Sequence, residues 1–262
     1  MVTANNCIDN KSTRKKVISH SASNSCISNS RRISTSKLSQ NAQPKSITIA
    51  DSNASSQNIN DPNLVVKLGD ISIFIKDINT LNDGQLLNDS IIDFYLKLVS
   101  KTIKNCVALS SFWYSKVLKK ETWKPNDVKL NNDTKVFIPI CFKKHWILIV
   151  FDNKFKSVCE YNSLKNLTDK AIISNCIKFI NSTFPSLKSI NWEIKVQTAP
   201  QQQDNNLTDC GVFVCLFARY LANDFEFNFN QDNITDFRLQ ITEEIRKAEL
   251  ENIGYGNLNK NQ

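Results

Sequence analysis

An apolar run of helical length, from Cys210 to Ala222, follows directly on a polar, turn-rich loop that ends at Asp209. A helix this apolar has to be buried, so the rest of a domain must pack around it. Thr208 and Asp209 favour a helix start, because Thr and Asp side chains can satisfy the free N–H groups of a first turn. Cys210 is thus predicted at a helix N-terminus, where those groups and the helix dipole favour a thiolate over a thiol. It is a candidate nucleophile, although a small buried residue is the commoner role of a cysteine.

Length and composition limit the classes of protein to consider. The 262 residues suffice for one large domain or two small ones with a real core. Eight cysteines form no CxxC pair and two histidines leave no zinc-finger spacing, so we expect neither a metal nor another cofactor. No run approaches about 18 apolar residues and no hydrophobic leader opens the sequence. These features predict a soluble, non-secreted protein with reduced thiols, in the nucleus, the cytoplasm or both.

Residues 1–63 form a basic tail rich in Ser, Asn, Lys and Arg. The tail holds eight Lys or Arg against three Asp, which is +5 of the +8 of the whole chain. It cannot bury enough apolar area to offset the entropy of ordering, so disorder is expected. Arg14 to Lys16 and Arg31 to Arg32 are candidate nuclear-import or anion-contacting patches, with a solvated tail or a transit peptide as alternatives. We expect a folded domain over 64–252 and a second disordered tail over 253–262.

The pattern changes at Leu64, where short strands and amphipathic helices begin. The predicted strands are Val65 to Leu68, Ile71 to Ile75, Val136 to Ile140, Trp146 to Phe151, Lys156 to Tyr161 and Trp192 to Val196. The predicted helices are Ile91 to Val99, Ser110 to Lys119, Ala171 to Phe184, Cys210 to Ala222 and Thr235 to Leu250. The strand that starts at Trp146 is unbroken in its apolar character, as expected of one buried on both faces. Helices that flank a central group of strands predict an α+β fold.

A cysteine nucleophile needs a base, usually His, and the folded part of the chain offers His145. An ordinary half-exposed histidine at a strand edge is the alternative. If the flanking strands form a hairpin with a turn centred on Asn153 and Lys154, Asn162 lies opposite His145, with Cβ atoms roughly 4.5–5.5 Å apart. The Asn oxygen can then accept the imidazole Nδ1–H and turn Nε2 toward a thiol. A one-residue slip would turn Asn162 to the other face.

The three residues occur in the order His, Asn, Cys, whereas papain-type enzymes run Cys, His, Asn. The order and the local sequences resemble the Ulp/SENP family of cysteine proteases, which process and remove the ubiquitin-like modifier SUMO, over about residues 64–250. The motifs that carry the resemblance are Leu87-Asn88-Asp89-Ser90-Ile91-Ile92-Asp93-Phe94-Tyr95-Leu96, Val136-Phe137-Ile138-Pro139-Ile140, His145-Trp146, Tyr161-Asn162-Ser163-Leu164 and Gln203 through Asp209-Cys210-Gly211-Val212. Within the family, residues 87–96, 110–114 and 203–205 favour the branch that edits SUMO chains.

The resemblance implies a papain-like, Ulp-type fold with a central mixed β-sheet flanked by helices. It implies Cys210 as the nucleophile, His145 as the base and Gln203 as the side chain of the oxyanion hole. Trp146 would cover the narrow tunnel that admits the Gly-Gly tail of the modifier, with a place in the core as the alternative. Asp89 would contact a basic residue on the modifier, and a helix N-cap is its alternative role.

Three positions depart from the family pattern. Asn162 stands where the family usually has Asp as the third catalytic residue, and a neutral amide stabilises an imidazolium less than a carboxylate does. Leu86 replaces a Trp that commonly lines one wall of the tunnel. Gln203 lies seven residues before the nucleophile, one more than usual, so Gln202 or Asp204 are alternatives for the oxyanion site.

The predicted function is that of a cysteine isopeptidase and endopeptidase that cleaves after the Gly-Gly of SUMO, in deconjugation, chain editing or precursor processing. One alternative is a protease for another modifier such as NEDD8, or a different acyl-transfer enzyme on the same scaffold. The other is a weakly active or inactive binding module, because of Asn162. SUMO and its conjugates are the expected partners of a monomer. The folded part has no recognisable nucleic-acid motif, and no membrane partner is expected.

Overall fold

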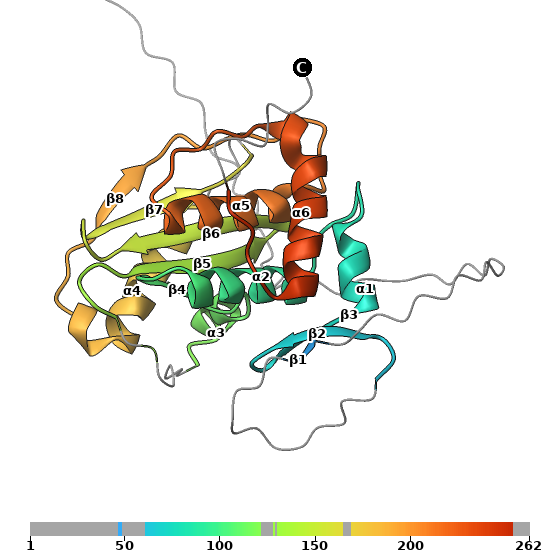
Figure 1. The fold of residues 1–262 in the computed structure, drawn as a ribbon. Coiled ribbons are helices and arrows are strands. Elements are labelled where there is room, and N and C mark those ends of the chain that lie inside the picture. The colour runs from blue at the N-terminus through green and yellow to red at the C-terminus, as the bar shows by residue number, and fades with distance from the viewer. Residues whose placement is uncertain (1–46, 49–60, 122–127, 129, 165–168, 254–262) are drawn as a thin grey trace, which may run out of the picture.

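The computed structural model describes residues 47–48, 61–121, 128, 130–164 and 169–253 (Figure 1). Its strands are β1 (Ile47–Thr48), β2 (Leu64–Leu68), β3 (Ile71–Phe74), β4 (Cys106–Ala108), β5 (Lys135–Phe142), β6 (His145–Asp152), β7 (Ser157–Tyr161) and β8 (Glu193–Val196). Its helices are α1 (Ile75–Ile78), α2 (Asp89–Thr102), α3 (Trp113–Leu118), α4 (Lys170–Thr183), α5 (Cys210–Ala222) and α6 (Ile234–Lys247), with short 3-10 turns η1 (Asn79–Leu81), η2 (Pro185–Leu187) and η3 (Gln231–Asn233). In the part of the chain that is described, no helix is long and apolar enough to cross a membrane.

The central sheet has five strands in the order β4-β5-β6-β7-β8, and β1, β2 and β3 form a smaller second sheet. The central sheet is mixed, because β4 with β5 and β7 with β8 are parallel, whereas β6 is antiparallel to both of its neighbours. Helices α2, α5 and α6 lie on one face and α3 and α4 on the other (Figure 1). The predicted α+β fold with a central mixed sheet flanked by helices is confirmed.

Strand β6 contributes to a hydrophobic core on each face of the sheet. One core, shared with α2, α5 and α6, receives Trp146, Leu148 and Val150. The other, shared with α3 and α4, receives Ile147, Ile149 and Phe151. This alternation explains why the strand is apolar without a break. Helix α5 packs between β6 and α2 and is buried from Cys210 to Tyr220, so the apolar run in the sequence is the central helix of the fold.

Most predicted elements are confirmed, with ends shifted by a few residues. The helix predicted over 110–119 begins only at Trp113. Its first residues are held in another conformation, because Asp93 accepts bonds from the Ser110 hydroxyl and the Ser111 N–H, each at 2.7 Å. Strands β1 and β4 and the short helix α1 have no counterpart among the predicted elements.

The hairpin between β6 and β7 has a longer turn than predicted. Leu148 pairs with Tyr161, and residues 153–156 form a four-residue turn. The carboxylate of Asp152, at the end of β6, accepts hydrogen bonds from the backbone N–H groups of Lys154 and Phe155, at 3.0 and 3.1 Å. These bonds stabilise the longer loop. The predicted two-residue turn is therefore wrong, and the partners shift by two positions. Because side chains alternate with a period of two, Asn162 stays on the face of His145, as a diagonal neighbour.

Two residues of the predicted N-terminal tail belong to a sheet. Ile47 and Thr48 form β1, which pairs in parallel with Val66 and Lys67 of β2. The predictions for the two basic patches, and for the C-terminal tail beyond residue 253, concern positions outside the described residues. All six cysteines in the described ranges are free thiols.

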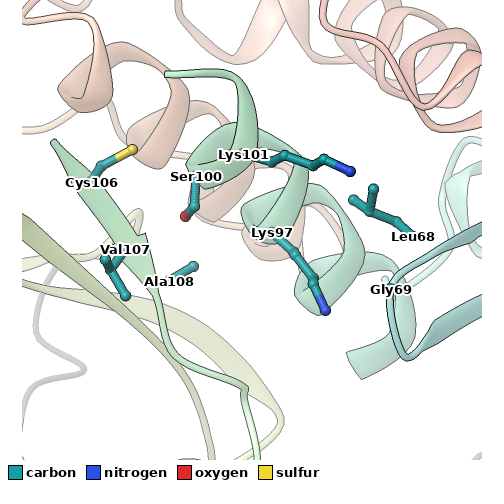
Figure 2. Close-up of a pocket in the computed structure, with 8 residues that line it drawn as sticks. All are labelled: Leu68, Gly69, Lys97, Ser100, Lys101, Cys106, Val107 and Ala108. Carbon is teal, nitrogen blue, oxygen red and sulfur yellow. The ribbon is translucent and has the colours of Figure 1, made fainter. Parts of the chain in front are cut away.

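A surface pocket of about 340 Å³ lies beside α2 (Figure 2). It is lined by Lys97, Ser100 and Lys101 of α2, by strand β4 and by the turn that follows β2. Lys97 forms an ion pair with Asp70 at this surface. None of the predicted site residues lines the pocket, so the predicted site has to be sought elsewhere, where α5 meets β6.

Candidate active site

Cys210 is the first residue of α5, as predicted, and is 1% exposed. Asp209 makes no side-chain capping bond to the helix, so the predicted cap is wrong; its carboxylate is bonded to Arg238 instead. The backbone N–H groups of Trp146, Gly211 and Cys210 itself lie against the sulfur and favour its thiolate form. The first turn of α5 therefore presents N–H groups to the thiol rather than to a cap.

Burial nevertheless raises the pKa of the Cys210 thiol, because desolvation of a thiolate outweighs the backbone N–H groups beside it. The N–H groups of the helix terminus act in the expected direction, toward the thiolate, but burial has the larger effect on the pKa. Desolvation raises the pKa of another buried thiol, Cys106, to about 11. Cys210 differs from Cys106 in having backbone N–H groups of a helix start beside its sulfur. It still needs a base to become a nucleophile.

His145 is the first residue of β6 and is 5% exposed. It pairs with Phe142 across a two-residue turn, in which Lys143 and Lys144 have φ values of 51° and 64°. This left-handed backbone favours Gly or Asn, so the turn that places the histidine is strained. Burial lowers the pKa of His145, and its bond to Asn162 raises it only in part. The imidazole is therefore neutral at pH 7 and able to accept a proton.

Asn162 lies one residue beyond β7, and its Oδ1 is 2.8 Å from His145 Nε2. The Leu164 N–H donates to the same oxygen at 2.9 Å, so it is the amide oxygen that faces the ring, and Nε2 carries the proton of the neutral imidazole. The predicted contact between the two side chains is confirmed. The predicted ring nitrogen is wrong, because Nε2 rather than Nδ1 bonds to Asn162. Nδ1 is then the nitrogen that remains to take a proton from a thiol.

Glu160 belongs to this group of residues, although sequence reasoning gave it no role. Its Oε1 accepts a hydrogen bond from Asn162 Nδ2 at 3.0 Å. Alternate residues of a strand share a face, so the spacing of two between Glu160 and Asn162 was the available signal.

Among the glutamines in the loop before Cys210, Gln202 is the buried one. Its Oε1 accepts the Ser163 hydroxyl at 2.6 Å, and its Nε2 donates to the Asn206 carbonyl at 2.6 Å. Gln203 is exposed, and its backbone N–H donates to the Gln231 side chain at 3.2 Å. Gln202, and not Gln203, therefore lies on the buried side of the loop, beside Ser163, which follows Asn162.

A buried ion pair lies behind Cys210. Asp209 Oδ1 accepts from Arg238 Nε at 3.1 Å and from its Nη2 at 2.6 Å. The other carboxylate oxygen accepts the side-chain amides of Asn206 and Gln231, at 2.6 and 2.7 Å. Arg238 also donates to three backbone carbonyls in the segment 80–85. This arginine of α6 therefore connects the loop before Cys210 to the segment that leads into α2.

Leu87 forms a second connection between the start of α5 and the segment before α2. The indole Nε1 of Trp146 donates to the Leu87 carbonyl at 3.0 Å. A Cβ atom added to Gly211 would lie 2.8 Å from the Leu87 Cβ, closer than side chains approach one another. Glycine after Cys210 is therefore a packing requirement, and the buried Trp146 ring is fixed at its indole nitrogen.

Two further predicted site residues lie at the start of α2. Leu86 is 44% exposed, so it presents apolar surface to solvent. Asp89 is the first residue of α2 and is half-buried. The N-cap of this helix is Asn88, whose Oδ1 accepts the Ile91 N–H at 3.1 Å. A capping role for Asp89 is therefore wrong, and its carboxylate stands beside the positive end of the helix dipole.

Comparisons with known proteins identify the family of the chain. A family model described as the Ulp1 protease family, C-terminal catalytic domain, matches residues 85–252. Ubiquitin-like-specific protease 1 of Saccharomyces cerevisiae is 29% identical over 170 residues, which cover 61% of this chain and 27% of that protein. Sentrin-specific protease 2 of Rattus norvegicus is 29% identical over 194 residues, which cover 66% of this chain and 32% of that protein. The chain thus spans about a third of the length of the curated relatives that it matches.

Solved structures share the fold. The Ulp1 protease domain in complex with Smt3, the yeast ortholog of SUMO, matches with a TM-score of 0.59 and 26% identity, over 74% of this chain and 90% of that one. Ulp1 with its catalytic cysteine oxidised to a sulfinic acid matches with a TM-score of 0.57 and 28% identity, over 68% of this chain and 84% of that one. The region matched by the family model contains His145, Asn162 and Cys210. The chain belongs to the Ulp1 protease family.

Proposed function

We propose that this chain is a cysteine isopeptidase and endopeptidase that cleaves after the Gly-Gly of SUMO. The observation that carries the proposal is the 2.8 Å bond between His145 and Asn162, next to a thiol at the start of α5 that touches the Trp146 N–H. Membership of the Ulp1 protease family supports the reaction class, and the similarity to a structure in complex with Smt3 supports the substrate.

In the first half of the reaction, Cys210 Sγ attacks the carbonyl carbon of the terminal glycine, and its proton passes to His145 Nδ1. The bond from Nε2 to Asn162 holds the ring in the tautomer that leaves Nδ1 unprotonated. The backbone N–H of Cys210 and the side-chain amide of Gln202 hold the oxyanion. Gln202 takes this role in place of Gln203, because Gln202 is buried whereas Gln203 is exposed. Ser163 holds its amide oxygen, one Nε2 hydrogen is bonded to the Asn206 carbonyl, and the second Nε2 hydrogen is the one that would hold the oxyanion.

In the second half, the tetrahedral intermediate collapses and the C–N bond breaks. His145 Nδ1–H donates its proton to the departing amine, which is the lysine amine of an isopeptide or the α-amine of a precursor. A thioester between the modifier and Cys210 remains. His145 then removes a proton from water, the hydroxide attacks the thioester, and the thiol leaves with that proton.

Two groups of residues receive the modifier in this proposal. Trp146, fixed by Leu87, covers the path of the Gly-Gly tail, and exposed Leu86 lines its outer wall. Asp89 contacts a basic residue on the folded part of the modifier, since Asn88 rather than Asp89 caps α2. We also propose that the catalytic domain spans residues 64–252 between two tails. The proposed location is the nucleus or the cytoplasm.

The test is turnover of a fluorogenic C-terminal amide of SUMO by the full chain. We expect Cys210→Ala to lower kcat by at least about 10³-fold, because no other group replaces the nucleophile. Cys215→Ala is the matched control, because Cys215 lies in the same helix and is wholly buried, and it keeps turnover. Equal, slow cleavage by wild type and Cys210→Ala would show that the proposal is wrong.

Electrophilic probes built on SUMO, NEDD8 and ubiquitin separate the alternatives. A covalent adduct of Cys210 with the SUMO probe alone supports the proposed substrate. An adduct with the NEDD8 probe alone identifies the other modifier. Binding of SUMO without an adduct identifies a non-catalytic module. Poly-SUMO chains and SUMO precursor, offered side by side, then show whether chain editing is the preferred reaction.

A further inference from the structure

Two hydrogen bonds in series join a carboxylate to the imidazole of the base. Glu160 Oε1 accepts from Asn162 Nδ2 at 3.0 Å, and Asn162 Oδ1 is 2.8 Å from His145 Nε2. The Leu164 N–H donates to that same oxygen at 2.9 Å, which fixes the direction of the amide. The order from the surface inward is therefore carboxylate, amide and imidazole, with each donor facing an acceptor.

The amide in the middle orients the ring but has no charge of its own. When His145 takes the proton of the thiol, it becomes an imidazolium whose charge an amide dipole stabilises weakly. A carboxylate at the far side of the amide polarises it, and bonds in such a chain strengthen one another.

We propose that Glu160 is a positioning residue of this active site, which supplies through Asn162 the negative charge that stabilises the His145 imidazolium. The inference rests on the proposed function, because it concerns the base of that reaction. Glu160 touches neither the substrate nor the reacting atoms, and it acts through Asn162.

The surroundings of Glu160 argue against a purely structural role. It pairs with Ile149 of β6 and Val196 of β8, which are uncharged, and among the described residues Asp169 before α4 is the charged group that acts on it. Burial raises the pKa of Glu160, the bond from Asn162 lowers it, and the charge of Asp169 raises it. A folded-state pKa above that of the unfolded chain means that the ionised carboxylate lowers stability as the pH rises through this range. Glu160→Gln should therefore not lower the melting temperature at pH 7.

Glu160→Gln isolates the charge, because the Gln Oε1 can still accept the Asn162 amide. The carboxylate and the ring are at most about 8 Å apart, since one amide group joins the two bonds. At an effective dielectric constant of about 20, unit charges at that separation change an equilibrium by about 30-fold. Glu160 is half-buried and solvent weakens the interaction, so we expect kcat to fall about 3- to 10-fold with KM unchanged.

The matched control is Glu193→Gln. Glu193 carries the same charge on the neighbouring strand β8, is exposed, and forms an ion pair of 3.5 Å with Lys195. We expect it to leave kcat at the wild-type value. An equal fall in kcat for both variants would attribute the effect to total charge and overturn the inference.

A second background should remove most of the effect. Asn162→Asp puts a carboxylate directly on the His145 ring. Two carboxylates about 3.0 Å apart, at the distance of the present bond, share one proton, so the pair carries one negative charge with or without Glu160. We therefore expect Glu160→Gln to lower kcat less in this background than in wild type. An equal or larger fall in the Asn162→Asp background would overturn the inference.

The titration of His145 provides a readout that does not depend on turnover. The chain has two histidines, so proton NMR with a His20→Gln variant assigns both resonances. We expect Glu160→Gln to lower the pKa of His145 by about 0.5 to 1, which corresponds to the 3- to 10-fold effect. If wild type cleaves no modifier reporter, the proposed function fails, while this titration still decides the role of Glu160. An unchanged His145 titration refutes it.

Discussion

Replacing Arg238 by methionine removes the positive half of the ion pair behind Cys210. The guanidinium donates twice to Asp209 Oδ1, and only 2% and 6% of the two side chains are exposed. It also donates to the carbonyl of Thr208 and to three carbonyls in the segment 80–85. Methionine retains most of the apolar contacts of the side chain and none of these bonds.

The expected loss in the free energy of unfolding is about 3–5 kcal/mol, the range for a buried pair that loses one partner. Asp209 keeps the amides of Asn206 and Gln231, at 2.6 and 2.7 Å, and each bond to a charged group contributes about 1.5–3 kcal/mol. The retained bonds place the loss at the lower end of that range. Most of it is the cost of a buried carboxylate without its counter-charge, so Asp209→Asn added to Arg238→Met should restore at least half of the loss.

Urea denaturation followed by tryptophan fluorescence at pH 7 measures these differences. Arg246→Met is the matched control, because Arg246 lies on the same helix α6 and is exposed. We expect the control to stay within about 0.5 kcal/mol of wild type. The reasoning is refuted if Arg238→Met is as stable as Arg246→Met, or if the double variant is less stable than Arg238→Met alone.

Two further predictions concern the nucleophile and its base. Gly211→Ala places a Cβ 2.8 Å from Leu87, and overpacking of this kind costs about 1–3 kcal/mol of stability. Because Leu87 holds the Trp146 indole, we also expect kcat/KM to fall at least about tenfold in the SUMO reporter assay. An unchanged kcat/KM would contradict the packing argument. Burial lowers the pKa of His145 below its ordinary 6.5 and raises that of Cys210, so the neutral imidazole that accepts the proton persists below pH 6.5. The acid limb of kcat/KM should then have its midpoint below pH 6.5, and a midpoint above pH 7 would contradict it.

The apolar pattern of the sequence was enough to predict the interior of the molecule. The run from Trp146 to Phe151 predicted a strand buried on both faces, and β6 has a core on each side. The run after Cys210 predicted a buried helix, and α5 lies between β6 and α2. The apolar pattern of such a run lies within a short stretch of sequence, so it is enough to predict that the element is buried. Strand β4, only three residues long, has too short a pattern to be found in this way.

The position of Asn162 was predicted correctly from an incorrect turn. Turn length depends on side-chain bonds such as those of Asp152 to the N–H groups of Lys154 and Phe155, which the apolar pattern does not encode. The error was two residues, and a strand repeats every two residues, so the side chain stayed on the face of His145. The bond then formed on Nε2 instead of Nδ1, because a diagonal neighbour meets the ring from another direction.

The start of α5 at Cys210 depends on a contact that local sequence rules do not describe. Asp before an apolar helix predicts a cap, but the carboxylate of Asp209 is bonded to Arg238, a residue of another helix. Sequence patterns cannot anticipate this partner, because the fold alone brings α6 beside the loop. The consequence is chemical, since a capping carboxylate would accept the first-turn N–H groups that lie against the sulfur. By holding Asp209 away from the helix, Arg238 leaves those groups to the thiol, while the charge of Asp209 itself acts in the other direction and raises the pKa of Cys210.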